Sequence, residues 1–383
     1  MVKERIVIVG GGYGGLRAVE RLAKCDGLEI TLIDKQPFHY FQTEAYRFVS
    51  GRLNTCDVTY DLRAFCSYFD TVTFIRDQVI AIEAGYIRGK LAIYPFDRLI
   101  IAVGTRDFIP ESFRPYAYGI KDIRSAYAFK QAFLAMLFER TTQGKAKKHI
   151  VIGGAGQSGV ELAADLMSIS NGCGNSSGYD NGIAVTLIEG SEQILPGAST
   201  RLQQDARKRL ELLGVTIRTG DFIESIEESV MYVGGERIPY DLFLFSGGVA
   251  PYPWLKESFL PTNEREFVLV DQQLRAAPNI FVIGDAAYIT DEKGRVLPPT
   301  AQLAEQCAEY VAKVIASGEH TPFRGRIYGM FTALGYRYGV GELFGRFYFK
   351  GRIAYVLKAL ITQLYAWGIK TKVNSAYFKR KNV

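Results

Sequence analysis

Three glycines near the start of the chain have the spacing of a nucleotide-binding turn. Residues 6–9 are β-branched and predict a buried strand, and Gly10, Gly12 and Gly15 follow at G-x-G-x-x-G spacing. Gly10 allows a tight turn, Gly12 lets backbone N–H groups approach a pyrophosphate, and Gly15 lets the next helix pack closely on the strand. The segment is therefore predicted to bind a dinucleotide.

The elements that must position this turn follow in the required order. We expect a helix over residues 16–24, whose N-terminus attracts phosphate, and a second strand over residues 28–33. Asp34 ends that strand, where its carboxylate can accept hydrogen bonds from ribose hydroxyls. The candidate residues of this site are Gly10, Gly11, Gly12, Tyr13, Gly14, Gly15 and Asp34.

A second copy of the pattern begins near residue 149. The apolar run 149–152 precedes the repeated glycine spacing, at Gly154, Gly156 and Gly159. Glu189 ends the later run 184–188, after a Gly/Asn/Ser-rich loop over residues 170–182. An acid there accepts from a 2′-hydroxyl and repels a 2′-phosphate, which favours NADH over NADPH. Two such turns imply two dinucleotides, and hydride transfer from nicotinamide to flavin is the usual reason for that pair.

Three further positions suit a flavin dinucleotide. Asp285 follows the apolar run 280–283 and a glycine, where it can hold a ribityl hydroxyl of FAD. Gly104 forms the turn that ends another apolar strand. Val79 follows a strand at a place where its backbone can pair with an adenine edge.

A helix that opens after two prolines carries the last candidate residues. Gln302 and Gln306 are four residues apart and share one side of this helix. The free N–H groups of its first turn can face a reduced flavin and stabilise its negative charge. Glu161 lies early in the helix after the second glycine turn, where a carboxylate near a flavin can relay a quinol proton.

The whole chain resembles a type II NADH dehydrogenase, the single-subunit NADH:quinone oxidoreductase that does not pump protons. The resemblance rests on the two glycine turns, on Ile283-Gly-Asp-Ala-Ala and, most specifically, on Thr300-Ala-Gln-Leu-Ala-Glu-Gln. The last segment fits the family's A-Q-x-A-x-Q quinone motif. The resemblance implies an enzyme that holds FAD non-covalently and passes electrons from NADH to a membrane quinone, either ubiquinone or menaquinone.

The same resemblance assigns roles to individual residues. Gln302 and Gln306 would border the quinone cavity, and Ala301 and Gln302 would contact the isoalloxazine. Asp34 and Lys35 would hold the FAD adenosine. Glu161 matches a family glutamate proposed to act in proton transfer at the flavin. A departure from the family pattern is Ser158, where the family usually carries Thr.

Charge is concentrated at the C-terminus. The chain carries a net charge of +6, yet residues 321–383 carry +11 and the remaining residues −5. Residues 351–372 read as an amphipathic helix with the apolar stripe Ile353, Val356, Leu357, Leu360, Ile361, Leu364 and Trp367, and with Arg352, Lys358 and Lys370 elsewhere. Such a helix is predicted to lie on an anionic lipid surface, unless it docks on its own domain. The tail also resembles the family's membrane-binding segment.

Several features argue against other classes of protein. We expect no secretory signal, and the sequence contains no run of about 18 apolar residues that could span a bilayer. The five cysteines include no pair at C-x-x-C or C-x-x-x-x-C spacing, so we expect no metal site and reduced thiols. Nucleic-acid binding is disfavoured, because the basic segment also carries an apolar stripe.

The sequence thus predicts an α/β protein of glutathione-reductase-like architecture, with two Rossmann-like dinucleotide-binding domains. The FAD domain comprises residues 1–107 and 248–317, the NADH domain residues 108–247, and the membrane-docking segment residues 318–383. We expect a homodimer at the cytoplasmic face of the cell membrane, attached peripherally.

Three alternatives stay open at this point. A sulfide:quinone oxidoreductase of the same fold would need cysteines at the flavin, for which Cys173 and Cys307 are the candidates. A non-enzymatic flavoprotein could instead respond to NADH by changing its partners. A ferredoxin or rubredoxin reductase is a weaker alternative, because it would not need the amphipathic tail.

Overall fold

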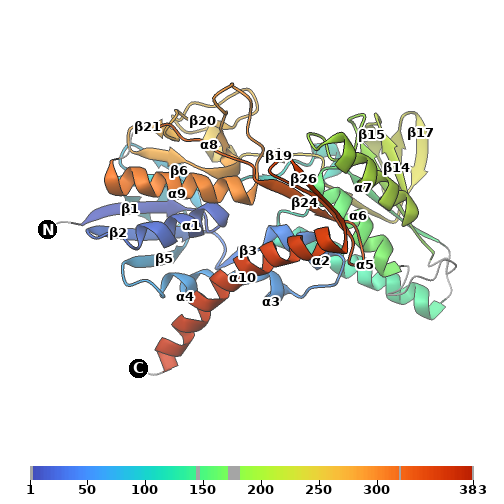
Figure 1. Cartoon of the computed structure of the whole chain (residues 1–383), viewed down its shortest axis with the longest axis horizontal. Helices are drawn as coiled ribbons and strands as arrows, with labels where there is room; N and C mark the ends of the chain where they lie inside the picture. Colours follow the sequence, from blue (N-terminus) through green and yellow to red (C-terminus); the bar gives the residue numbers. More distant parts are fainter. Residues whose placement is uncertain (1–2, 144–146, 171–181, 319–320, 382–383) are drawn as a thin grey trace.

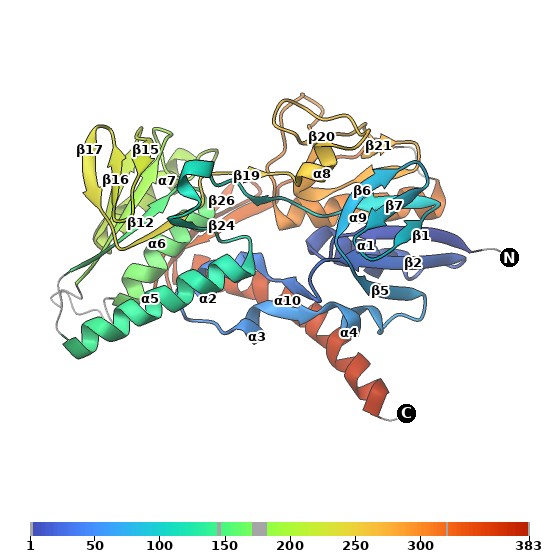
Figure 2. The same ribbon diagram turned by 180° about the vertical axis from the view of Figure 1, so that it is seen from behind.

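The computed structural model describes residues 3–143, 147–170, 182–318 and 321–381. Two α/β units lie side by side, each built on its own mainly parallel sheet, and the C-terminal helix α10 (Arg352–Lys381) runs from between them along the edge of the first unit (Figure 1). Both views of the molecule show the C-terminal end of α10 projecting beyond the rest (Figure 2).

The first unit is built on a six-stranded sheet with β1 near its centre. In spatial order the strands are β21 (Arg275–Ala277), β22 (Ile280–Val282), β9 (Arg98–Ile101), β1 (Glu4–Val9), β2 (Leu28–Asp34) and β5 (Val72–Arg76). All neighbours are parallel except β21 and β22. The carboxyl ends of β1 and β2, where open parallel sheets bind ligands, carry the first glycine turn and Asp34.

Both faces of this sheet are buried, because alternate residues of β1 point to opposite sides. Ile6 and Ile8 pack in the core that includes α1 (Tyr13–Leu22) and α9 (Ala301–Ser317). Val7 and Val9 pack in a second core with the three-stranded meander β6 (Val79–Glu83), β7 (Tyr86–Gly89) and β8 (Ile93–Pro95).

The second unit repeats this plan with five strands. Their order is β11 (Ala117–Tyr118), β18 (Leu242–Phe245), β12 (Lys148–Gly153), β13 (Ile183–Glu189) and β14 (Val215–Thr219), all parallel. Its long helices are α5 (Ile123–Gln143), α6 (Gln157–Ser170) and α7 (Thr200–Leu212), and its antiparallel sheet is β15 (Ile223–Ile226), β16 (Val230–Val233) and β17 (Glu236–Pro239). The chain passes between the units at β10 (Arg106–Asp107) and β19 (Val249–Ala250), which pair antiparallel. The first unit is therefore discontinuous in sequence.

Short elements complete the connections between these layers. They are β3 (Phe38–Tyr40), α2 (Ala45–Val49), α3 (Thr55–Val58), β4 (Thr59–Asp61), α4 (Leu62–Cys66), α8 (Pro253–Lys256), β20 (Val268–Leu269) and β23 (Ala287–Tyr288), with 3₁₀ turns at Gln42–Glu44, Glu111–Phe113 and Gly284–Ala286. Most of the loop predicted over residues 170–182 lies outside the described residues.

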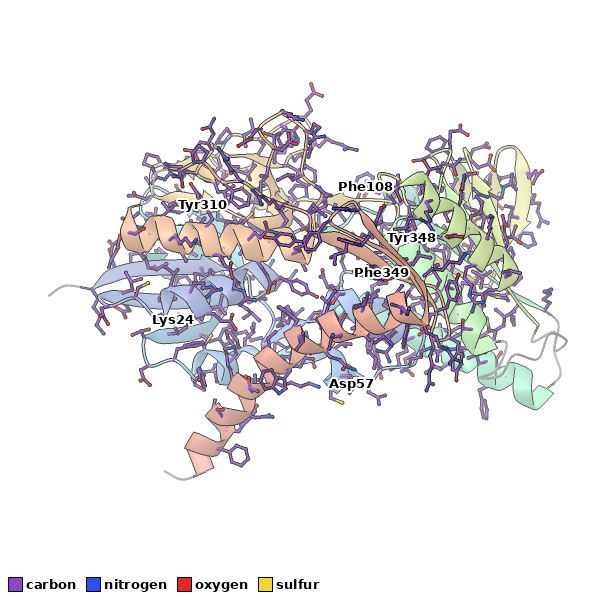
Figure 3. All side chains as sticks on the ribbon, in the orientation of Figure 1. Lys24, Asp57, Phe108, Tyr310, Tyr348 and Phe349 are labelled. Atoms are coloured by element: carbon purple, nitrogen blue, oxygen red, sulfur yellow. The ribbon has the colours of Figure 1, made fainter. Side chains whose placement is uncertain are left out.

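The C-terminal segment begins with the antiparallel meander β24 (Gly329–Ala333), β25 (Gly339–Leu343) and β26 (Phe347–Gly351). Tyr348 and Phe349 of β26 lie on the side of this meander near the second unit (Figure 3). The Tyr348 hydroxyl donates to Asp205 of α7 over 2.6 Å, and Lys350 pairs with the same carboxylate over 2.9 Å. This segment therefore contacts the second unit before α10 turns back along the first. No described helix is long and apolar enough to cross a membrane.

The first helix differs from the expected span of residues 16–24, since α1 begins at Tyr13 and ends at Leu22. Glycine's low helix propensity favoured the later start, but the glycines of its first turn are needed for close packing. A Cβ atom on Gly15 would lie 1.8 Å from the Gly10 carbonyl oxygen. Gly10 itself has φ of +107° and would meet the Ala102 carbonyl oxygen at 2.5 Å. The turn and the helix therefore pack at a distance that only glycine permits.

We expect Gly15→Ala to lower the free energy of unfolding by about 3 kcal/mol, because the added methyl group forces the helix away from the strand. Urea unfolding followed by far-UV circular dichroism measures the loss. Gly368→Ala in α10 is the matched control, since nothing lies within 4 Å of its added Cβ and helical alanine is slightly stabilising. Equal stability of the two variants would contradict the close-packing argument.

Candidate active site

A cavity of about 1300 Å³ lies where the two units and the C-terminal segment meet. It exceeds the volume of about 300–1000 Å³ that is usual for one small-molecule site, so it has room for more than one ligand. Its walls come from the first glycine turn, the start of α6, the start of α9, β24 and the inner side of α10. Its lining includes Gly12, Asp34, Glu161, Gln302, Lys358 and Tyr365.

The first glycine turn faces this cavity with its polar groups already oriented. Gly11 N–H donates to Asp34 Oδ2 over 2.6 Å, and Gln36 N–H donates to Asp34 Oδ1 over 2.7 Å. Burial raises the pKa of Asp34, and these two N–H donors oppose the rise. The carboxylate has further lone pairs, so it can also accept from a ribose hydroxyl.

The residues fit a flavin dinucleotide. A Cβ on Gly12 would find its nearest neighbour 3.9 Å away, so the glycine leaves open the space that a pyrophosphate needs. The N-terminus of α1 carries no acidic residue in its first turn, which suits phosphate. Tyr13, Gly14 and Lys35 also line the cavity, as do Gly104 and Ala301.

Asp285 lines the same cavity as Asp34, and it lies on the 3₁₀ turn after β22. Lys121 Nζ lies 3.0 Å from Asp285 Oδ2 and 2.7 Å from Thr105 Oγ1. The Asp285 carboxylate has further lone pairs, so it can also accept from a ribityl hydroxyl. Sequence analysis did not single out Lys121.

The second glycine turn repeats the geometry of the first. Ala155 N–H donates to Glu189 Oε2 over 2.7 Å, and Ser191 N–H donates to Glu189 Oε1 over 2.9 Å. A Cβ on Gly159 would lie 2.0 Å from the Gly154 carbonyl oxygen, while none of the described atoms lies within 4 Å of one on Gly156. These residues do not line the large cavity, but Gln157 and Ser158 at the start of α6 do.

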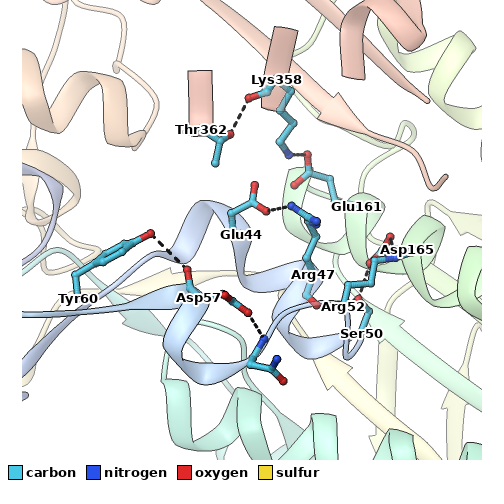
Figure 4. A network of polar contacts seen from close by, with 11 residues as sticks. Glu44, Arg47, Ser50, Arg52, Asp57, Tyr60, Glu161, Asp165, Lys358 and Thr362 are labelled. Carbon is cyan, nitrogen blue, oxygen red and sulfur yellow. Dashed lines mark hydrogen bonds and ion pairs between the residues drawn. The ribbon is translucent and has the colours of Figure 1, made fainter. Parts of the chain in front are cut away.

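Glu161 meets a partner that sequence analysis did not foresee. Its side chain is 4% exposed, and its Oε1 accepts from the Ala333 N–H over 2.9 Å and forms an ion pair with Lys358 of α10 (Figure 4). Burial raises the pKa of Glu161, and the Lys358 ammonium and the Ala333 N–H oppose the rise. A carboxyl group in this setting can hold or release a proton at the cavity wall.

Lys358, one of the residues expected off the apolar stripe, lies on the side of α10 that faces the cavity. Lys358 is 9% exposed because it points inward to Glu161 and lies 4.5 Å from the centre of the Tyr46 ring. No signal in the sequence marks Lys358 as buried, because it shares the less apolar face of the helix with Ala354 and Thr362, and helical periodicity does not show which face is covered.

One turn beyond Glu161, a second buried carboxylate joins the two units. Asp165 of α6 accepts from Ser50 Oγ over 2.5 Å and from Arg52 Nε over 2.8 Å. Glu44 and Arg47, paired over 2.9 Å, lie between Asp165 and the Lys358–Glu161 pair (Figure 4). This network fixes α2 of the first unit against α6 of the second.

The structure separates the remaining candidate residues. Gln302 lines the cavity, and its Oε1 accepts from the Tyr328 N–H over 2.8 Å. Gln306 does not line it, because its amide forms two hydrogen bonds with the backbone of Arg326, of 2.7 and 2.9 Å. Val79 does not line it either, because its side chain is buried in the second core. The roles suggested for Gln306 and Val79 stay predictions.

The one candidate redox cysteine among the described residues, Cys307, offers little redox chemistry. Cys307 is fully buried in α9, and burial raises its pKa to about 12, so it is a poor nucleophile. Cys173 lies outside the described residues. No group of three metal-ligating side chains occurs among the residues that the structure describes.

Comparisons with known proteins identify the family to which this chain belongs. The family model for pyridine nucleotide-disulphide oxidoreductases matches residues 4–308. The type II NADH:quinone oxidoreductase of Staphylococcus aureus is 30% identical, over 94% of this chain and 95% of that protein. This chain belongs to the type II NADH:quinone oxidoreductase family. The family resemblance seen in the sequence is thereby confirmed.

Solved structures agree on the fold of this family. NDH2 from Plasmodium falciparum matches with a TM-score of 0.85 at 20% identity, over 99% of this chain and 98% of that one. The sulfide:quinone oxidoreductase from Aquifex aeolicus matches with a TM-score of 0.81 at 16% identity, over 96% and 92%. The predicted α/β fold of the FAD- and NAD(P)-binding oxidoreductases is confirmed.

We expect Lys358→Met to lower the free energy of unfolding by about 3–5 kcal/mol at pH 8, because Glu161 is left buried and unpaired. The folded-state pKa of Glu161 lies above its unfolded value, so the variant loses stability as the pH rises and the unpaired Glu161 carboxyl ionises. At pH 5 more of this carboxyl is protonated, and the stability of the variant is then closer to that of the parent protein.

Urea unfolding at both pH values measures this effect, with the double variant Glu161→Gln/Lys358→Met as control. The double variant removes both charges and should recover most of the stability, with a smaller pH dependence. The pairing argument fails if the single and double variants are equally unstable at pH 8.

Proposed function

We propose that this protein oxidises NADH and reduces a membrane quinone, with FAD bound in the large cavity. The observation that carries the proposal is that this cavity joins three features: the dinucleotide turn, the Glu161–Lys358 pair and the inner side of α10. Family membership supports the same reaction, since the Staphylococcus aureus relative is an NADH:quinone oxidoreductase.

The overall reaction converts NADH, a proton and a quinone to NAD⁺ and a quinol. FAD, when bound, supplies the redox chemistry that links a hydride donor to a quinone acceptor. The residues of the chain bind and orient FAD and NADH. Asp34 and the first glycine turn hold the adenosine and pyrophosphate, Asp285 holds the ribityl chain, and Glu189 with the second turn holds NADH.

A quinone that takes up two electrons also takes up two protons, and Glu161 is placed to supply one of them. Its carboxyl lines the cavity, and its raised pKa suits it to proton exchange. Lys358 would compensate the charge that Glu161 gains when it gives up its proton. Gln302, at the start of α9, would border the quinone ring.

The quinone would reach this site along α10. Ile361, Thr362 and Tyr365 of α10 line the cavity, and Ile361 is also exposed on the outer side of the helix. The outer side carries an apolar stripe of exposed residues: Ile353, Val356, Leu360, Ile361, Leu364 and Trp367. We propose that this stripe rests in the interface of an anionic bilayer, so that the protein is attached peripherally.

Three finer assignments are part of the same proposal. The FAD domain comprises residues 1–107 and 248–317, the NADH domain residues 108–247, and the docking segment residues 318–383. The membrane face is the cytoplasmic one, and the protein is a homodimer. Analytical ultracentrifugation with lipid and without it tests the dimer.

The activity test measures NADH oxidation by the purified FAD protein with and without a soluble quinone. We expect Glu161→Gln to lower the quinone-dependent kcat by about 100-fold, because a positioned proton donor is lost. Bleaching of the flavin by NADH without quinone should change far less. The matched control is Glu257→Gln, an exposed acid outside the cavity. A protein that NADH does not bleach, or that a quinone does not reoxidise, would refute the proposal.

The lipid test measures co-sedimentation of the protein with vesicles that contain about 30% anionic lipid, a fraction of the order found in cell membranes. Leu364→Gln with Trp367→Gln should weaken binding about tenfold or more, because two apolar anchors are lost from the interface. Leu212→Gln is the control, since Leu212 is 80% exposed on a helix of the second unit. Equal binding by the parent protein, the double variant and the control would show that this stripe is not the lipid-binding surface.

A further inference from the structure

A chain of hydrogen bonds runs from α10 to the acid of the first nucleotide turn. The Tyr365 hydroxyl lies 3.4 Å from His39 Nε2, and His39 Nδ1 lies 2.9 Å from the Gly11 carbonyl oxygen. The N–H of the same glycine donates to Asp34 Oδ2 over 2.6 Å. Both polar groups of Gly11 are therefore held, one by the acid and one by the histidine.

The direction of this chain follows from which groups can donate. A carbonyl oxygen only accepts, so His39 Nδ1 must carry the proton. His39 is 1% exposed, and burial lowers its pKa to about 4, so the ring is neutral near pH 7. Nε2 of a neutral ring with Nδ1 protonated is an acceptor, and the Tyr365 hydroxyl is then the donor.

Aromatic packing holds the two rings in place. Tyr13 meets His39 edge-on with ring centres 5.0 Å apart, and Phe41 stacks on Tyr365 at 5.4 Å. Tyr365 is the contribution of α10 to this cluster, whereas Tyr13, His39 and Phe41 belong to the first unit. The Tyr365 ring thus lines the cavity beside the turn that we assign to FAD.

We propose that His39 and Tyr365 are positioning residues for the FAD-binding turn, so that docking of α10 and retention of FAD stabilise each other. His39 fixes the plane of the peptide that joins Gly11 to Gly12 and thereby the Gly12 N–H, which would face the pyrophosphate of bound FAD. Tyr365 fixes His39. Coupling between two binding events is reciprocal, so whatever loosens α10 at Tyr365 also loosens FAD.

This inference rests on FAD as the cofactor but not on the identity of the electron acceptor. A protein that binds no FAD would overturn the proposed function, whereas a protein that holds FAD equally well without these side chains would overturn only the inference. The test therefore follows FAD itself, with neither NADH nor quinone present.

The experiment measures the rate at which diluted holoprotein releases FAD, from the rise in free-flavin fluorescence. We expect Tyr365→Phe to release FAD about fivefold faster, the usual effect of one lost hydrogen bond. Tyr377→Phe is the matched control, because it removes a hydroxyl of the same helix that donates to Asp61 instead, over 3.3 Å. Release from this control should stay within about twofold of the parent.

A second variant shows whether Tyr365 acts through His39. His39→Asn keeps an N–H near the Gly11 carbonyl oxygen but loses the acceptor for Tyr365. The double variant His39→Asn/Tyr365→Phe should release FAD no faster than His39→Asn alone, because the two side chains act in series. Additive effects would overturn the inference, as would equal release rates for Tyr365→Phe and Tyr377→Phe.

Hydrogen exchange supplies the reciprocal measurement. FAD release should speed amide exchange in residues 361–369 of α10 in the parent protein, and this change should shrink in Tyr365→Phe. Exchange in α10 that does not respond to FAD in the parent protein would overturn the coupling.

Discussion

One buried ion pair holds the three parts of this molecule around their common cavity. Glu161 comes from the second unit, and Lys358 comes from the C-terminal helix that runs along the first. Either charge alone would be buried without a partner, at a cost of several kcal/mol, so the helix cannot leave the cavity wall without a large penalty. The burial that raises the pKa of Glu161 also makes Lys358 necessary. Stability and the proposed proton exchange would therefore depend on the same pair.

The two nucleotide turns show how a fold prepares for a ligand with its own polar groups. In each, a carboxylate at the end of the second strand accepts from a backbone N–H of the turn, Asp34 from Gly11 and Glu189 from Ala155. The loop is thus oriented without a bound nucleotide, which reduces the entropy lost on binding. The turns differ in their surroundings, because Asp34 lines the large cavity and Glu189 does not. This difference supports the assignment of FAD to the first turn and NADH to the second.

The sequence was most informative where chemistry is local. Glycine spacing and strand-end acids depend on residues a few positions apart or one strand away, so both nucleotide turns could be located with their acids. The ion pair could not, because Glu161 and Lys358 are distant in the chain and nothing in helical periodicity says which face of a helix is covered. Lys121 and His39 were missed as partners for the same reason. The start of α1 was misplaced because a glycine in a first turn argues against helix by propensity, although close packing required it there.

The two faces of the C-terminal helix α10 carry different residues, and the geometry of one helix links their positions. Lys358, Tyr365 and Ile369 share the inner face, while Val356, Leu360 and the other exposed apolar residues share the outer one. The inner face is the less apolar, since it carries the groups that meet a buried carboxylate and a buried histidine. Apolarity alone therefore indicates the outer face, which remains exposed and suits a lipid interface. Because one residue turns a helix by about 100°, the two faces cannot be adjusted independently. The proposed contact with lipid and the proposed contact with the flavin site would therefore be set by a single helical register.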